Sequence, residues 1–107
     1  MSVFQAIAED RRREILGLLR DRELSVGDVA ARFDVTQPAI SQHLKVLRNA
    51  GLVSARRDGT RHMYSARPEG FADLHRFLAS FLPEGLERLK QAAEAEERSG
   101  ARDADRN

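Results

Sequence analysis

The side chains best suited to recognition chemistry are concentrated in residues 36 to 51, TQPAISQHLKVLRNAG. The polar side chains here are amides, hydroxyls, an imidazole and cations, and no carboxylate occurs between residues 36 and 57. Amides and hydroxyls can hydrogen-bond to base edges in the DNA major groove, whereas lysine and arginine neutralise phosphates. The predicted DNA-contacting residues of this stretch are Thr36, Gln37, Ser41, Gln42, His43, Lys45 and Arg48.

The same stretch carries the start and stop signals of one helix. The Thr36 hydroxyl can cap the first turn, Pro38 lies where a backbone N–H is not needed, and Gly51 permits a left-handed stop. Between these signals runs a narrow apolar stripe of Ile40, Leu44 and Leu47. An ordinary solvated helix mixes both signs of charge on its exposed face, so a merely polar helix explains this composition less well than DNA binding does.

A shorter amphipathic helix is expected just before this one. Ser25 can cap its start, with Asp28 three residues later in an imperfect capping-box arrangement. Its expected buried residues are Val26, Val29, Ala30 and Phe33. Two short helices joined by three or four residues, the second with a polar exposed face, are typical of a helix-turn-helix.

A β-hairpin with a basic tip is expected after the polar helix. Residues 52–57 and 60–65 have strand-like composition, and Asp58-Gly59 between them is a strong turn signal. A wing of this kind can lie along the DNA backbone or enter the minor groove. The residues of the hairpin that we predict to contact DNA are Arg56, Arg57, Arg61 and His62.

Apolar residues near both ends of the chain predict faces wider than one small domain can cover. A short first helix is expected from Val3, and the apolar face between Phe71 and Leu82 predicts a helix that Pro83 stops or kinks. An exposed patch of this size predicts a homodimer. The predicted interface comprises Phe4, Ile7, Phe71, Leu74, Phe77, Leu78 and Phe81.

A second helix, capped by Asp10, is expected between the first helix and the helix-turn-helix. Its first turn contains three consecutive arginines, at positions 11 to 13. Cations at a helix N-terminus oppose the helix dipole and add little stability. We therefore expect these arginines mainly to pair with Glu9 or Glu14, and only secondarily to reach a phosphate.

The length, composition and charge of the chain limit which folds and functions are possible. The chain has 107 residues, 41% hydrophobic and 33% charged, which predicts one small domain over residues 1 to 98 and a disordered tail from 99 to 107. The net charge of +1 conceals a middle segment, residues 36–67, that carries +5 between acidic flanks. With no cysteine, no signal segment and no apolar run of ~18 residues, we expect a cytoplasmic protein without disulfides or thiolate metal sites.

Three segments together resemble the ArsR/SmtB family of repressors: RRREIL at 11–16, QPAISQHLKVL at 37–47 and GLV at 51–53. The resemblance extends over about residues 3 to 82. It implies a mainly α fold with a small β-hairpin, a winged helix-turn-helix of order α-α-α-α-β-β-α. It further implies dimers formed through the first and last helices, and repression by binding a two-fold symmetric operator, with the protein's own operon as a candidate target.

The sequence departs from the metal-sensing members of that family. Ser25-Val26-Gly27-Asp28 stands where those members have Cys-Val-Cys-Asp. Asp73 and His75 resemble the start of a second metal motif, but its later positions are Leu86 and Leu89, which cannot be ligands. We therefore expect no metal and no cofactor, and the sequence does not name a small-molecule effector.

Two other classes of function compete with DNA binding. Catalysis would have to use Ser41 and His43, but residues two apart on a helix point in different directions, so we expect no enzyme. The alternative that stays open is a winged helix used as a protein-interaction module, with the basic face meeting an acidic partner. Salt-sensitive binding to unrelated DNA duplexes would count against that alternative.

Overall fold

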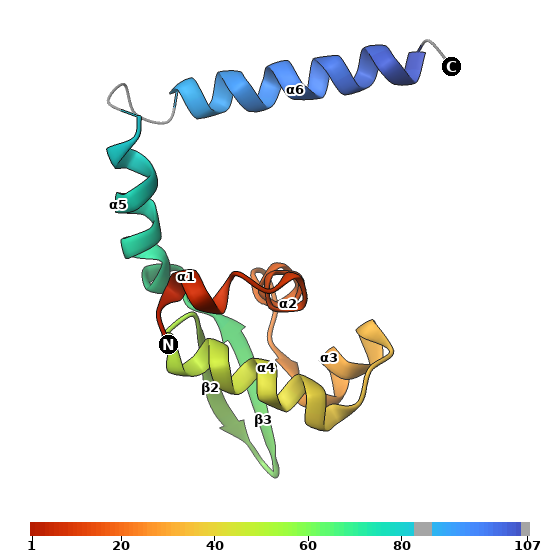
Figure 1. Ribbon diagram of the computed structural model, residues 1–107. Helices are drawn as coiled ribbons and strands as arrows, with labels where there is room; N and C mark the ends of the chain where they lie inside the picture. Colours follow the sequence, from red (N-terminus) through yellow and green to blue (C-terminus); the bar gives the residue numbers. More distant parts are fainter. Residues whose placement is uncertain (83–86, 106–107) are drawn as a thin grey trace. The chain divides into compact units, whose positions relative to one another are not determined.

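The computed structural model describes residues 1–82 and 87–105 and is mainly helical, with a small antiparallel sheet (Figure 1). In chain order the elements are α1 (Val3–Ala6), α2 (Asp10–Leu19), β1 (Leu24–Ser25), α3 (Val26–Phe33), α4 (Gln37–Asn49), β2 (Val53–Asp58), β3 (Arg61–Ala66), the 3-10 helix η1 (Pro68–Phe71), α5 (Ala72–Ser80) and α6 (Glu87–Asp105). The predicted fold class, a helix-turn-helix followed by a β-hairpin wing, is confirmed.

The chain divides into two compact units, Met1–Leu74 and His75–Asn107. The first unit holds the helix-turn-helix and the wing. In the second, α6 is built largely from alanine, glutamate and arginine, which are good helix formers, and it continues to Asp105. The single domain over residues 1–98 and the disordered tail from Ser99 stay predictions. Pro83 and Leu86 lie outside the described residues.

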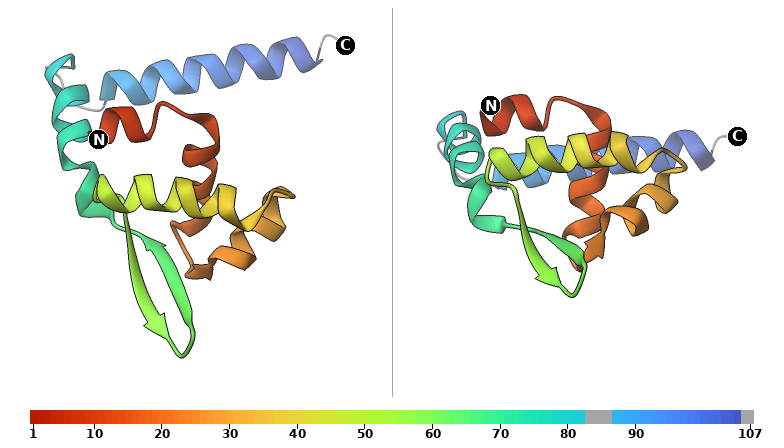
Figure 2. Two further views of the ribbon diagram at one scale, coloured as in Figure 1. Left: turned by 60° about the horizontal axis from the view of Figure 1, so that its bottom comes forward. Right: turned by 90° about the horizontal axis from the view of Figure 1, so that it is seen from below.

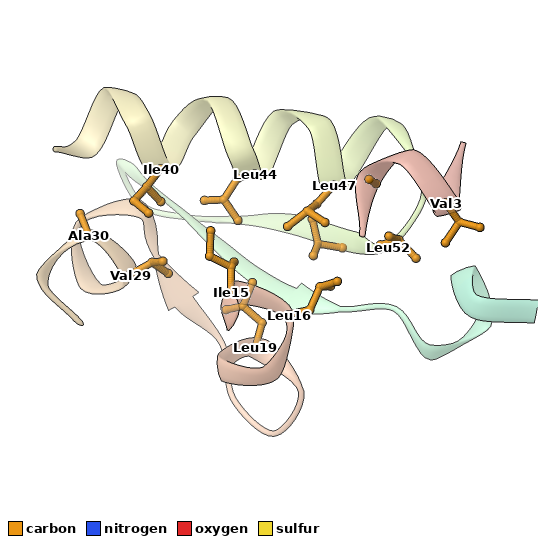
Figure 3. Close-up of a cluster of buried hydrophobic side chains, with 12 residues drawn as sticks. Val3, Ile15, Leu16, Leu19, Val29, Ala30, Ile40, Leu44, Leu47 and Leu52 are labelled. Carbon is orange, nitrogen blue, oxygen red and sulfur yellow. The ribbon is translucent and has the colours of Figure 1, made fainter. Parts of the chain in front are cut away.

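The core of the first unit contains twelve buried hydrophobic side chains, shown in Figure 3. Ile40, Leu44 and Leu47 point from α4 toward the side chains of α2 and α3, and each is at most 1% exposed. These are the three residues of the predicted apolar stripe. Because one side of α4 is fixed in the core in this way, its opposite side faces outward.

The predicted helix ends are mostly confirmed. The Thr36 hydroxyl accepts a hydrogen bond from the Ala39 N–H at 3.3 Å, and Ser25 and Asp28 form a complete capping box at the start of α3. Gly51 has a φ of +80°, as expected for the residue that ends α4. The prediction for α2 was wrong by one residue: Glu9 is the N-cap, and its carboxylate binds Arg12 instead of capping.

The sheet has three strands in the order β1-β3-β2, one more than the predicted hairpin. β1 pairs with β3 through Leu24↔Tyr64 and Ser25↔Met63. A two-residue strand is too short to show an alternating pattern, so no sequence signal marks it. The turn is also one residue later than predicted, because Asp58 pairs with Arg61 and leaves Gly59 and Thr60 in the loop.

A close backbone contact joins η1 to the connection between α4 and β2. A Cβ atom on Gly70 would lie 2.9 Å from the carbonyl carbon of Gly51 and 3.3 Å from the Cα of Leu52. Next to this contact, the Arg67 N–H donates a hydrogen bond to the Leu52 carbonyl at 2.8 Å. The end of the wing is thereby held against the end of α4.

Candidate nucleic-acid interface

The exposed side of α4 carries most of the predicted contact residues. At about 100° per residue, Gln42 and Lys45 lie roughly opposite the buried stripe. Gln37, Ser41 and Arg48 lie on one flank of the helix. The exposed members of the predicted set on α4 are Gln37, Ser41, Gln42, Lys45 and Arg48. The structure therefore brings five of them together on one continuous surface.

His43 does not belong to that surface. Its side chain is only 21% exposed, and its Nε2 atom lies 3.4 Å from a carboxylate oxygen of Glu9, just before α2. About 200° of helical rotation separates it from Ser41. This arrangement places His43 on the other flank of α4, and it also leaves Ser41 and His43 too far apart to act as a nucleophile and its base.

The start of α4 lies beside the start of α3. A Cβ atom on Gly27 would be 3.4 Å from the side-chain nitrogen of Gln37, so the small residue in α3 leaves room for this amide. Thr36 is exposed, but its hydroxyl oxygen already accepts the capping hydrogen bond. Of Thr36 and Gln37, Gln37 therefore has the side chain that is better placed to contact an external molecule.

The wing, formed by β2 and β3, projects beyond the helices of its unit (Figure 2). Its cross-strand register pairs Arg57 with His62 and Asp58 with Arg61. Since successive side chains alternate between the faces of a strand, Arg56 and Arg61 share one face, and Arg57 and His62 share the other. The four predicted contact residues of the wing are therefore divided between two faces.

On the first face, both arginines bind carboxylates of the same chain. Arg56 Nε lies 2.8 Å from a carboxylate oxygen of Glu23. The Arg61 guanidinium donates to the Ser25 hydroxyl at 2.8 Å and to the Asp28 carboxylate at 2.9 Å. These contacts fasten the wing to β1 and to the start of α3. Sequence reasoning missed them because the partners are 33 residues apart and meet only through the unpredicted strand β1.

The carboxylates in these contacts are held in their charged form. The hydrogen bond from Arg56 lowers the pKa of Glu23 below its ordinary value. Hydrogen bonding with the Ser25 side chain, and then with its backbone N–H, lowers the pKa of Asp28, with a smaller contribution from Arg61. Both shifts favour the ionised partner that an arginine needs.

On the second face, the cation is more available. Arg57 donates through Nε to the carbonyl of Gly59 at 3.2 Å. Among residues 1–82 and 88–99, whose side chains the structure describes, no carboxylate forms an ion pair with it. His62, its cross-strand neighbour, is exposed. Arg57 is therefore the wing arginine best placed to meet an external anion.

A polar hollow of about 460 Å³ joins the wing tip to the starts of α3 and α4. Its lining residues are Ser25, Val26, Gly27, Asp28, Gln37, Thr60, Arg61 and His62. The hollow connects the amide of Gln37 with the tip of β3. The helix-turn-helix and the wing thus form one surface. Its central segment, residues 36–67, has a formal net charge of +5, and two of its arginines pair with Glu23 and Asp28 from outside the segment.

The predicted dimer residues fall into two groups. Ile7, Phe71 and Leu74 are partly buried and pack against the core of the first unit. The others are exposed large apolar side chains: Phe4 at 42%, Phe77 at 49%, Leu78 at 43% and Phe81 at 66%. In the second unit, the rings of Phe77 and Phe81 meet edge to face, with centroids 5.0 Å apart.

The part of the chain that the structure describes contains no group of three or more histidine, cysteine, aspartate or glutamate side chains able to hold a metal ion. Ser25, at the position of the family's first metal-binding cysteine, is 8% exposed and caps α3. Leu89, at one of the later positions of the metal motif that begins with Asp73 and His75, is 47% exposed.

No helix among the described residues combines the length and the apolar composition that a membrane span requires.

The family model described as "Bacterial regulatory protein, arsR family" matches residues 9–55, which run from the start of α2 into β2. The HTH-type transcriptional regulator Rv2034 of Mycobacterium tuberculosis is 41% identical over 93 residues, which cover 87% of each chain. The transcriptional repressor SdpR of Bacillus subtilis is 34% identical over 84 residues, which cover 78% of this chain and 93% of SdpR.

A similar solved structure is the homodimeric winged helix-turn-helix DNA-binding domain of a possible ArsR-family transcriptional regulator from Mycobacterium bovis. It superposes with a TM-score of 0.62 at 36% sequence identity, and 80% of each chain is covered. All these names describe transcriptional regulators, which are not a class of enzyme. The likeness to these relatives extends over most of the sequence, and the chain belongs to the ArsR family of bacterial regulatory proteins.

Proposed function

We propose that the protein is a homodimeric transcriptional repressor that binds a two-fold symmetric DNA operator in the cytoplasm, with its own promoter as the first candidate target. The observation that carries this proposal is the exposed side of α4, which lacks carboxylates and lies next to a basic wing. Membership in the ArsR family supports it. The repressor SdpR is similar over most of its length, which supports a repressor role.

In this proposal α4 enters the major groove. Gln37, Ser41 and Gln42 have the amide and hydroxyl groups that hydrogen-bond to base edges, and they lie on the early and middle turns of the helix. Lys45 and Arg48 follow on later turns and meet phosphates. His43, whose ring faces Glu9, serves to position α4 against α2 rather than to read a base.

The wing contacts the DNA backbone through its second face. Arg57 and His62 supply the phosphate contacts there, since Arg57 pairs with no carboxylate among the described residues. Arg56 and Arg61 instead hold the wing in position through Glu23 and Asp28. A wing fixed in this way presents Arg57 at a set distance from α4.

The two copies pair through exposed apolar residues, namely Phe4, Phe77, Leu78 and Phe81. The similar domain from Mycobacterium bovis is homodimeric, which supports this assembly. In a symmetric dimer the two α4 helices meet successive major grooves, so the half-sites should lie about 34–36 Å apart, one helical turn of DNA.

Footprinting on the promoter of the protein's own gene tests the proposal. We expect two protected half-sites related by a two-fold axis, and loss of protection at the same protein concentration when the half-site sequence is scrambled. Equal protection of the intact and the scrambled half-sites, unchanged by salt, would contradict the proposal. That result would favour the protein-interaction module, in which the basic surface binds an acidic partner instead of DNA.

A further inference from the structure

We infer that a hollow between α2, the end of β3 and η1 binds a small organic acid with an apolar body, and that this acid is an effector of the repressor. The hollow is about 430 Å³, within the range of about 300–1,000 Å³ that is common for ligand pockets. Its lining residues are Leu16, Gly17, Arg20, Ala66, Pro68 and Phe71. All of them belong to the first unit, and the effector role rests on the proposed function.

Gly17 is an exposed residue that lines this hollow without a side chain. It lies inside α2, where glycine costs about 1 kcal/mol of helix stability relative to alanine. The fold does not require it: a Cβ atom there would meet nothing within 4 Å, and its φ is not in the left-handed region. Because residue 17 has no side chain, the hollow beside it has space for a ligand that is not part of this unit.

The walls and the rim of the hollow indicate the chemistry of that occupant. Leu16, Pro68 and Phe71 offer apolar surface, so the ligand needs an apolar body. Arg20 is the one charged residue among those that line the hollow. Its side chain is 78% exposed, and it pairs with its neighbour Asp21, which lies 3.2 Å from Nε and is 69% exposed.

An exposed pair of neighbouring residues is weak, so Arg20 can exchange it for a ligand. The guanidinium presents a fork that matches a carboxylate. The nearby charge of Asp21 disfavours a ligand with two negative charges over one with a single charge. An apolar monocarboxylic acid satisfies the walls and the rim together.

The position of the hollow suits an effector. Ala66 ends β3, and Arg61, at the other end of that strand, holds the wing to α3. Leu16 is part of the core against which α4 packs. A ligand in the hollow therefore touches both elements that position the DNA-binding surface. Its effect on DNA binding then depends on how differently it binds the free and the DNA-bound states.

The experiment uses octanoate as the probe and its uncharged counterpart octanamide as the control, with binding to the full chain followed by NMR. We expect octanoate to shift the signals of residues lining the hollow and to bind about tenfold more tightly than octanamide. Arg20→Gln should remove that preference. Gly17→Leu should abolish binding of both compounds, whereas Gly17→Ala, which fills little of the space, should retain it.

Saturating octanoate should change operator affinity by about fivefold or more in the wild type and not in Gly17→Leu. Operator affinity without octanoate should be equal in the two proteins, which shows that the variant is folded. The inference is overturned if the shifts lie outside the hollow, if Gly17→Leu binds octanoate normally, or if that variant loses self-association, since a second copy would then fill the space. Octanoate binding is measured without DNA, so its failure is distinct from failure of the repressor proposal.

Discussion

The arginines of this chain have several different roles, and the residue type alone does not show which role each one has. Arg12 is 12% exposed and donates to the carbonyls of Gln5 and Ala6 as well as to Glu9. Arg61 holds the wing, and Arg57 faces outward without an ion pair to any described residue. The expected pairing of the first-turn arginines with Glu9 or Glu14 is confirmed for Arg12 and Arg11, whereas Arg13 pairs with Asp10. The roles of the wing arginines could be assigned only from the register of the sheet, which depends on contacts between residues far apart in the sequence.

Gly70 is expected to be indispensable for stability. In Gly70→Ala the new methyl group would overlap the backbone of Gly51, which cannot move aside as a flexible side chain could. We expect a loss of about 1–3 kcal/mol in the free energy of unfolding, measured with urea. Gly17→Ala is the matched control and should gain about 0.5–1 kcal/mol. Equal stability of the two variants would show that η1 does not pack as described.

The residues at the positions of the family's thiolate pair predict the response to metals. Ser25 and Gly27 offer no thiolate, and the hydroxyl of Ser25 is occupied in the capping box. Zn(II), Ni(II) and As(III) are therefore expected to leave operator affinity unchanged. Fluorescence anisotropy with each ion checks this, with a metal-free chelated sample as the control. Release of DNA by submicromolar metal would refute it.

Among the elements, α1 to α5 were predictable, whereas β1, η1 and α6 were not. α4 was found from its apolar spacing and end signals, because these are properties of neighbouring residues. β1 has only two residues and exists because β3 lies beside it. The contact between His43 and Glu9 has a similar origin, because the two residues lie far apart in the sequence. Pairings of this kind depend on the tertiary fold.

The stability that Asp28 contributes, by capping α3 and by binding Arg61 of the wing, should depend on pH. The pKa of Asp28 is lowered in the folded state, chiefly by hydrogen bonding with Ser25. A lowered carboxyl pKa gives stability that is present above the unfolded value and is lost as the pH falls through the folded value. The stability difference between wild type and Asp28→Asn should therefore be constant above about pH 5 and shrink below roughly pH 4. The amide of the variant preserves the shape of the capping side chain.

Urea unfolding of the two proteins across this pH range measures the difference. Asp21→Asn is a suitable control, because Asp21 is 69% exposed and pairs with its exposed neighbour Arg20. A stability difference for Asp28→Asn that does not change with pH would show that the folded state does not stabilise the charged form of the Asp28 carboxylate.

For the molecule as a whole, the exposed phenyl rings predict self-association. Phe81 is 66% exposed, more than expected for an aromatic side chain of a stable monomer. We expect the wild type to sediment as a dimer at micromolar concentration and Phe81→Glu to shift toward monomer. Ala31→Glu, at an exposed position of α3, should remain dimeric. A monomeric wild type would contradict the dimer and, with it, the two-fold operator.

The proposed division of labour has α4 reading bases while the second face of the wing, with Arg57 and His62, binds phosphates. Its decisive test is fluorescence anisotropy, at a series of salt concentrations, on the operator and on a scrambled duplex. Gln42→Ala should cost about 1–3 kcal/mol for each base contact on the operator and little on scrambled DNA. Arg57→Ala should weaken binding to both duplexes and reduce the salt slope by roughly one unit for each phosphate contact that the substitution removes.

In a dimer each substitution occurs twice, so both effects can be about doubled. Arg22→Ala, which removes an exposed cation outside the proposed surface, is the control and should change neither quantity. We expect Gln42→Ala to lower the ratio of operator affinity to scrambled affinity and Arg57→Ala to leave this ratio unchanged. The division between helix and wing is contradicted if Gln42→Ala weakens both duplexes equally, or if Arg57→Ala leaves the salt slope at its wild-type value.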